Sequence, residues 1–147
     1  MTAALRAARA SDWPSIATLL ENAQLPLDGA EDHLETFVVA VNADDRVVGA
    51  GGLELYGDAA LLRSLVVESP GSGLGTAIVT RLLADAEARG VRDVVLLTTT
   101  APGFFPRFGF EPITRDEVPS SVRSSVEFRG ACPASAQAMR RSSVVKM

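Results

Sequence analysis

A glycine-rich run occupies residues 71–76, with the order Gly-Ser-Gly-Leu-Gly-Thr. A largely apolar stretch precedes it, and a segment with apolar residues at three- and four-residue intervals follows it, so the run should join a strand to a helix start. Backbone N–H groups and the helix dipole at such a start favour a phosphate. We therefore predict a phosphate-binding loop, made of Gly71, Ser72, Gly73, Leu74, Gly75 and Thr76.

Two common phosphate loops fit this run poorly. The nucleotide P-loop places a lysine and a hydroxyl residue after its last glycine, whereas Gly75 is followed by Thr76 and Ala77. The dinucleotide fingerprint needs an acid at the end of the next strand, but that predicted strand ends in Leu97-Thr98-Thr99. From the residues alone, a simple tight turn stays open as a third interpretation.

A carboxylate and a guanidinium are predicted to share one face of a hairpin. Gly57-Asp58 is a two-residue turn signal between two strand-like runs. In that register Glu54 faces Leu61, and Arg63 is its diagonal neighbour. Glu54 could then act as a base, and Arg63 could bind an anionic substrate through its forked donors. The alternative is a structural ion pair on a solvent-exposed face.

The order of strands and helices that must position these groups predicts an α/β (α+β) fold. Helices should flank both faces of a mixed sheet of about six or seven strands. With no internal repeat and no linker, residues 1–147 are expected to form a single domain. The expected strands are 3–8, 36–41, 46–56, 59–67, 91–97, 110–114 and 134–141; the expected helical segments are 11–22 (capped by Ser11), 73–89, 103–108 and 116–125.

Composition excludes several classes of function. The chain has 14 basic and 18 acidic residues, and a net charge of −4 argues against nucleic acid or an anionic membrane as a partner. With Cys132 as the single cysteine and His33 as the single histidine, neither an internal disulfide nor a metal site is expected. No stretch approaches the ~20 apolar residues of a membrane span, so we expect a cytoplasmic protein. Its apolar C-terminal segment could form the edge of a homodimer.

The run from Leu61 to Gly90 resembles the acetyl-CoA pyrophosphate loop of the GNAT superfamily of N-acetyltransferases. Residues 104–110, Phe-Phe-Pro-Arg-Phe-Gly-Phe, resemble that family's second motif, a short helix with an aromatic pair before a glycine-phenylalanine. The resemblance implies acetyl-CoA as acetyl donor, a sheet that splays after its fourth strand, and direct transfer to the amine of a small acceptor. A non-catalytic acetyl-CoA-binding module is the alternative.

The resemblance also implies roles for individual residues. Glu54 would take a proton from the amine, whose pKa is near ~10.4. Phe105 stands where a tyrosine commonly protonates the thiolate, and Tyr56, Ser64 or Cys132 could replace it. The implied oxyanion donors are the N–H groups of Leu65, Val66 and Val67; further cofactor contacts are Val66, Val67, Thr99, Phe104, Phe105 and Arg107; substrate contacts are Arg63, Ser64, Tyr56, His33, Thr98 and Cys132.

Shorter matches suggest a subgroup. Residues 61–64, 97–101 and 132–136 resemble small acetyltransferases linked to arsenic resistance, and the tail from Leu97 is similar to the acetyltransferase domain of glutamate N-acetylating enzymes. These resemblances imply an amino-acid-like acceptor. The loop departs from the family by being shorter and by having Pro70 where an arginine or glutamine is usual, which predicts weaker cofactor binding.

Overall fold

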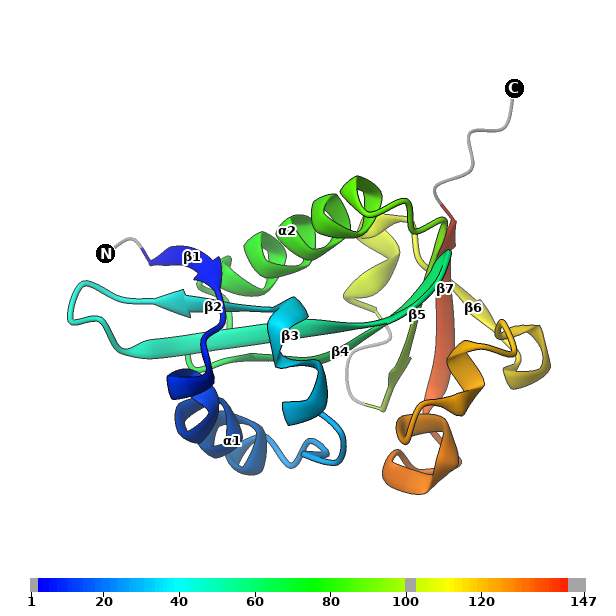
Figure 1. The fold of residues 1–147 in the computed structure, drawn as a ribbon, viewed down its shortest axis with the longest axis horizontal. Helices are drawn as coiled ribbons and strands as arrows, with labels where there is room; N and C mark the ends of the chain where they lie inside the picture. Colours follow the sequence, from blue (N-terminus) through cyan, green and yellow to red (C-terminus); the bar gives the residue numbers. More distant parts are fainter. Residues whose placement is uncertain (1–2, 100–102, 143–147) are drawn as a thin grey trace. The chain divides into compact units, whose positions relative to one another are not determined.

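A computed structural model describes residues 3–99 and 103–142. Its strands form a seven-stranded sheet in the order β1-β2-β3-β4-β5-β7-β6 (Figure 1). The β4–β5 pair is parallel, whereas β1–β2, β2–β3, β5–β7 and β6–β7 are antiparallel. The strands are β1 (Ala4–Ala7), β2 (Phe37–Val41), β3 (Val47–Tyr56), β4 (Ala59–Val67), β5 (Asp93–Thr98), β6 (Glu111–Ile113) and β7 (Gln137–Ser142).

Two α-helices and several shorter turns complete the described part of the chain. They are α1 (Trp13–Asn22), α2 (Leu74–Ala88), η1 (Ala10–Asp12), η2 (Glu31–Thr36), η3 (Phe105–Phe108), η4 (Arg115–Glu117), η5 (Val122–Ser124) and η6 (Glu127–Ala131). The predicted α/β class and mixed sheet are confirmed. The helical stretch expected over residues 116–125 consists of the short turns η4 and η5 rather than a helix.

The chain divides into two compact units, of which the first contains the described residues up to Leu53 together with Arg63–Leu82. Its core joins α1 to β2 and β3, and Figure 1 shows α1 and the first turns of α2 on opposite sides of these strands. A period of 3.6 residues explains the spacing of the buried α1 side chains. The buried members of this core are Ile16, Leu19, Leu20, Val39, Val41, Val47, Ala50 and Val66.

Gly51 lets α2 approach β3 closely on the face opposite α1. A Cβ atom at this position would lie 2.9 Å from Cγ2 of Ile78 and 3.1 Å from Cδ1 of Leu82. Ala50, the preceding residue, packs in the α1 core. Because successive strand residues point to opposite faces, the two helices cover both faces of β3 within the first unit, as predicted.

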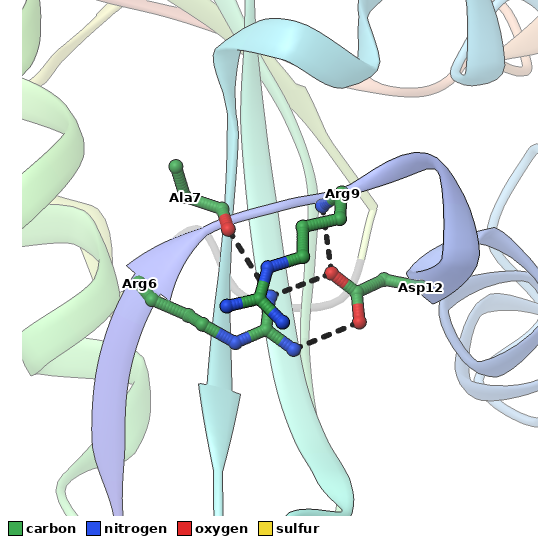
Figure 2. Close-up of polar contacts among 4 residues, drawn as sticks. All are labelled: Arg6, Ala7, Arg9 and Asp12. Carbon is green, nitrogen blue, oxygen red and sulfur yellow. Dashed lines mark hydrogen bonds and ion pairs between the residues drawn. The ribbon is translucent and has the colours of Figure 1, made fainter.

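The start of α1 differs from the prediction. Ser11 is exposed in η1, and the N-cap residue is Asp12. The carboxylate of Asp12 accepts bonds from Nη1 and Nη2 of Arg6, at 2.7 and 2.9 Å, and from the Arg9 N–H at 2.7 Å (Figure 2). Charge-assisted bonds of this kind are stronger than those a serine hydroxyl could make. The expected Ser11 cap was therefore wrong, and the Asp12 carboxylate instead ties α1 to β1.

The second unit contains Glu54–Leu62 and the described residues from Leu83 onward. Its β4–β5 register runs from the Ala59–Asp93 pair to the Leu61–Val95 pair, and β5 continues along β7 to the Thr98–Gln137 pair. The expected splay beyond this point stays a prediction. One buried cluster of this unit, called here the β4–β5 cluster, consists of Ala59, Leu61, Val95, Val118, Val122 and Ala138.

Arg115 holds the segment before β7 in place. Its Nη2 donates to the carbonyl oxygens of Pro133, Ala134 and Ala136 at 3.0, 3.4 and 3.2 Å. Its guanidinium also lies 5.8 Å from the ring centroid of Phe128, which packs against the β4–β5 cluster. The Arg115 guanidinium thereby contacts both Phe128, which packs against this cluster, and the chain that leads into β7. Within the described ranges, no helix has the length and apolar character needed to cross a membrane.

Candidate active site

The glycine loop ends where α2 begins, as predicted. The Ala77 N–H donates to the Gly73 carbonyl at 3.1 Å, so the N–H groups of Leu74, Gly75 and Thr76 precede the first intrahelical bond. Ser72 Oγ lies 3.4 Å from the Leu74 nitrogen. Residues 71–73 are exposed. Several main-chain donors therefore gather at the positive end of a 15-residue helix dipole.

Two glycines of this loop have backbone angles that other residues avoid. Gly71 has φ +84° and Gly73 has φ +83°. No atom lies within 4 Å of a Cβ added at either position. The requirement for glycine at both positions is therefore conformational rather than steric.

Glu68, which directly follows β4, is tied to β3. The Glu68 N–H donates to the Val48 carbonyl at 2.8 Å, and Oε1 of Glu68 lies 2.6 Å from Nη2 of Arg46. Both side chains are more than a third exposed, so the ion pair adds little stability. The Arg46 guanidinium nevertheless offsets the negative charge of Glu68, which lies close in sequence to the predicted phosphate site.

Ser64 adopts a left-handed conformation inside β4. Its φ is +60°, and the residue is 9% exposed. Nε of Arg63 donates to Ser64 Oγ at 3.0 Å, and Nη2 of Arg63 donates to the Pro26 carbonyl at 3.3 Å. A left-handed non-glycine residue costs about 1–2 kcal/mol and persists only where its surroundings enforce it. The predicted contacts Arg63 and Ser64 thus lie together at an irregularity that directly precedes Leu65, Val66 and Val67.

Glu54 and Tyr56 form a hydrogen-bonded pair at the end of β3. The Tyr56 hydroxyl donates to Oε1 of Glu54. Glu54 is 1% exposed, and Arg63 is 2% exposed. The alternative interpretation of these two charges, a pair on a solvent-exposed face, is therefore wrong. A buried carboxylate and a buried guanidinium are more typical of functional sites than exposed ones are.

His33 lies in η2, which is bonded to β3 directly before Glu54. The Thr36 hydroxyl lies within hydrogen-bonding distance of the carbonyl oxygens of His33, at 2.9 Å, and Leu53. His33 is half-buried, and its N–H donates to the Ala30 carbonyl. This anchoring places η2 against the strand that leads to the predicted base.

The aromatic motif forms a packed group in the second unit. The Phe105 ring meets the rings of Phe104 and Phe110 edge to face, with centroids 5.1 and 5.8 Å apart, and Phe105 is 6% exposed. The Arg107 guanidinium lies 4.8 Å from the Phe104 centroid. Phe105 thus has a packing role that needs no hydroxyl, whereas Arg107 is exposed.

The remaining predicted contacts are less closely associated. Thr98 is half-buried at the end of β5, Thr99 is exposed, and Thr100 and Ala101 lie outside the described residues. Cys132 is half-buried, and its N–H donates to the Glu127 carbonyl. Sequence reasoning missed two buried polar residues, Ser125 and Glu127, which are 2% and 4% exposed. Neither belongs to a motif, so only packing reveals them. Nowhere in the described part of the chain do three or more His, Cys, Asp or Glu residues gather as a metal site would need.

A family model described as the acetyltransferase (GNAT) family matches residues 2–110 of the 147. The chain belongs to this family. GNAT enzymes take their acetyl group from acetyl-CoA, so the chain is an acetyl-CoA-dependent acetyltransferase of the GNAT type. The predicted superfamily and acetyl donor are confirmed. No curated protein matches the chain.

Solved structures share the GNAT fold of this chain. N-acetylglutamate synthase from Neisseria gonorrhoeae, complexed with coenzyme A and N-acetyl-glutamate, has a TM-score of 0.82 and 22% identity, covering 99% of this chain. The present chain spans only 36% of that synthase. Rv2747 from Mycobacterium tuberculosis, in complex with CoA, has a TM-score of 0.80 and 26% identity over 96% of this chain and 99% of its own. YhbS from Escherichia coli, also in complex with CoA, has a TM-score of 0.63 and 28% identity over 74% and 68%.

Proposed function

We propose that this GNAT chain, acting as one domain, acetylates the amine of a small, carboxylate-bearing molecule such as an amino acid. The observation that carries the proposal is the burial of two opposite charges, Glu54 and Arg63, at 1% and 2% exposure. Tyr56 donates to Glu54, and Arg63 donates to Ser64 and Pro26, so both charged groups are held in place inside the protein. An amine and a carboxylate are the acceptor groups whose chemistry is complementary to a carboxylate base and a guanidinium.

Glu54 is the proposed general base. An alkyl ammonium has a pKa near ~10.4, so at neutral pH most acceptor molecules are protonated and unreactive. A carboxylate that accepts this proton, directly or through water, frees the nitrogen lone pair for attack on the thioester carbonyl. The N–C bond then forms and the C–S bond breaks. The ammonium group loses two protons: the first ends on Glu54, and the second passes through water to the leaving thiolate.

Arg63 is the proposed anchor for the acceptor's carboxylate. A guanidinium offers five N–H donors in a rigid fork, and two of its nitrogens already donate to Ser64 and Pro26. Those bonds hold the planar group in one orientation. A fixed fork recognises a planar carboxylate better than a lysine ammonium would.

Two further elements complete the proposed chemistry. Main-chain N–H groups of Leu65, Val66 and Val67, beyond the left-handed Ser64, are the proposed oxyanion donors. Phe105 supplies no proton to the leaving group, but a thiol pKa near ~8.5 makes thiolate an adequate leaving group that water can protonate. The α2 start, with Gly71 and Gly73, is the proposed place for the pyrophosphate of acetyl-CoA.

Two observations support a particular class of acceptor: the local sequence similarities to acetyltransferase subgroups, and the fold shared with the Neisseria synthase. N-acetyl-glutamate, with which the Neisseria synthase is complexed, is an acetylated amino acid. The local similarity to arsenic-resistance acetyltransferases favours amino-acid-like toxins as well. We therefore propose amino acids and their phosphono or arsono analogues as the acceptor class.

Release of free thiol from acetyl-CoA tests the proposal across paired acceptors. Each amino acid is compared with the amine that lacks only its α-carboxylate, and acetyl-CoA binding is measured separately by calorimetry. We expect kcat/KM to be at least about tenfold higher for the carboxylate-bearing member, the effect of about one charge-assisted hydrogen-bond pair. Equal values for both members would exclude the Arg63 role. Acetyl-CoA binding without thiol release from any acceptor would favour a non-catalytic binding module.

A further inference from the structure

We propose that Tyr56 is a positioning residue that orients the Glu54 carboxylate as the proton acceptor. The inference rests on the proposed function of Glu54 and adds a second residue to it. It is carried by the hydrogen bond between the two side chains and by the packing of the Tyr56 ring.

The pair is built into the strand. Glu54 and Tyr56 are two residues apart in β3, so their side chains lie on the same face. The Tyr56 hydroxyl donates to Oε1 of Glu54. A hydrogen bond to one oxygen restricts the rotation of the carboxylate group, and so it also restricts the position of the second oxygen. A base must hold its geometry to within fractions of an ångström for efficient proton transfer.

The Tyr56 ring is held by the core of the second unit. It packs against the β4–β5 cluster, as do Leu97, Ile113 and Phe128. Arg115 in turn holds Phe128 and the chain before β7. The phenol is therefore supported by a packed core, and its hydroxyl can direct the carboxylate without a large loss of side-chain entropy.

The same bond governs the charge of Glu54. Burial disfavours the ionised form of a carboxyl group, whereas a hydrogen bond donated to the carboxylate favours that form. Only the ionised form can accept a proton from the acceptor amine. Tyr56 therefore offsets, at neutral pH, the effect of placing this base out of water.

Tyr56 is the single tyrosine of the chain, which gives the pair its own spectroscopic signal. Ionising a phenol beside a carboxylate brings two negative charges together and removes the hydrogen bond, so the tyrosinate absorbance should appear at a pH above the usual ~10. Replacing the carboxylate with an amide, in Glu54→Gln, should bring that midpoint back toward ~10. Identical midpoints in both proteins would overturn the inference whether or not an acceptor is known.

Kinetics test the positioning role on the acceptor identified by thiol release. Tyr56→Phe removes one oxygen and keeps the ring, and we expect about tenfold lower kcat, an unchanged KM for acetyl-CoA, and an acidic limb of the pH profile moved to higher pH. Phe128→Leu is the matched control, because Phe128 packs against the same cluster as Tyr56 does. It should lower the melting temperature without moving the acidic limb.

A double variant separates this inference from the proposed function. If Tyr56 acts through Glu54, adding Tyr56→Phe to Glu54→Gln causes no further loss of kcat. An independent, multiplicative loss would overturn the positioning role while leaving the base assignment intact. Full activity of Glu54→Gln would remove the base assignment, and with it the inference, even if the absorbance titration shows the pair.

Discussion

The glycine loop before α2 and the end of β3 differ in exposure and in the chemical groups that they would present to the ligands proposed for them. Residues 71–73 are exposed, and what they offer is main-chain N–H groups held by the positive φ angles of Gly71 and Gly73. Glu54 is buried, and what it offers is one side chain that Tyr56 orients. The loop should therefore be sensitive to backbone conformation, and the strand end to the identity of single atoms.

In the proposed reaction the loop would bind acetyl-CoA, and the end of β3 would act on the acceptor. A pyrophosphate is the same in every acetyl-CoA, and main-chain donors at a helix start suffice to bind it. The proposed recognition of the acceptor depends instead on side chains such as Arg63. A substitution at Glu54 and one at Gly73 each change one of these two regions, and a substitution at Asp12 changes a buried charge outside both.

The largest effect is expected for Glu54→Gln. This change keeps the shape and removes the base, so kcat should fall about 10²–10⁴-fold while the Kd for acetyl-CoA stays within about twofold. Initial rates of thiol release and calorimetry measure the two quantities. Glu111→Gln, at an exposed position of β6, is the matched control. A comparable loss of acetyl-CoA affinity would show that the two regions are not separable as described.

A buried charge outside the strand end should affect stability instead of turnover. Asp12 is 6% exposed, and Arg6, through its side-chain hydrogen bonds, holds the pKa of this carboxyl below its usual range, helped by the Arg9 N–H. Asp12→Asn should lower the free energy of unfolding by about 1–3 kcal/mol at neutral pH and leave kcat unchanged. Denaturant unfolding and thiol release give the two values.

The pH dependence of this effect has a definite sign. Because the folded-state pKa of Asp12 is lowered, its contribution is complete above the unfolded value of ~3.9 and is lost as the pH falls through the folded value. The difference in unfolding free energy between the native protein and Asp12→Asn should therefore shrink on acidification below about pH 4. A difference that stays constant over this range would contradict the role given to the ion pair.

The position of the glycine loop and the start of α2 could be predicted because both depend on residues that are neighbours in the sequence. Glycines between an apolar strand and a periodic segment identify the start of α2, and the observed helix begins at Leu74, one residue after the predicted start. Hairpin turn Gly57-Asp58 likewise sets the ends of β3 and β4, at Tyr56 and Ala59. Nearest neighbours along the chain decide both features.

The side-chain contacts at the end of β3 could not be predicted because they depend on packing between distant segments. Tyr56, which donates to Glu54, packs against a cluster that includes Val118 and Val122, far along the chain. The same limit explains the wrong cap at Ser11: Asp12 is favoured by Arg6 on β1, outside the helix itself. Ser125 and Glu127 are buried by tertiary packing, and no spacing rule marks them.

The smallest effect, and the most direct test of the loop, comes from two glycines at opposite ends of α2. Gly73 has φ +83° before the helix and Gly90 has φ +79° after it, and a Cβ atom at either would meet nothing within 4 Å. An alanine at each position therefore carries the same strain, about 1–2 kcal/mol, without a clash. Both variants should lose similar stability in denaturant unfolding.

Only the N-terminal variant should lose affinity for acetyl-CoA. Gly73→Ala shifts the main-chain donors of Leu74, Gly75 and Thr76, so calorimetry should show up to about tenfold weaker binding, as 1.4 kcal/mol of that strain would produce. Gly90→Ala leaves these donors in place and should bind as the native protein does. Equal affinities for the two variants would mean that side chains, rather than the conformation of this loop, hold the pyrophosphate. The loop would then not differ from the end of β3 in the way described, because both would depend on side chains.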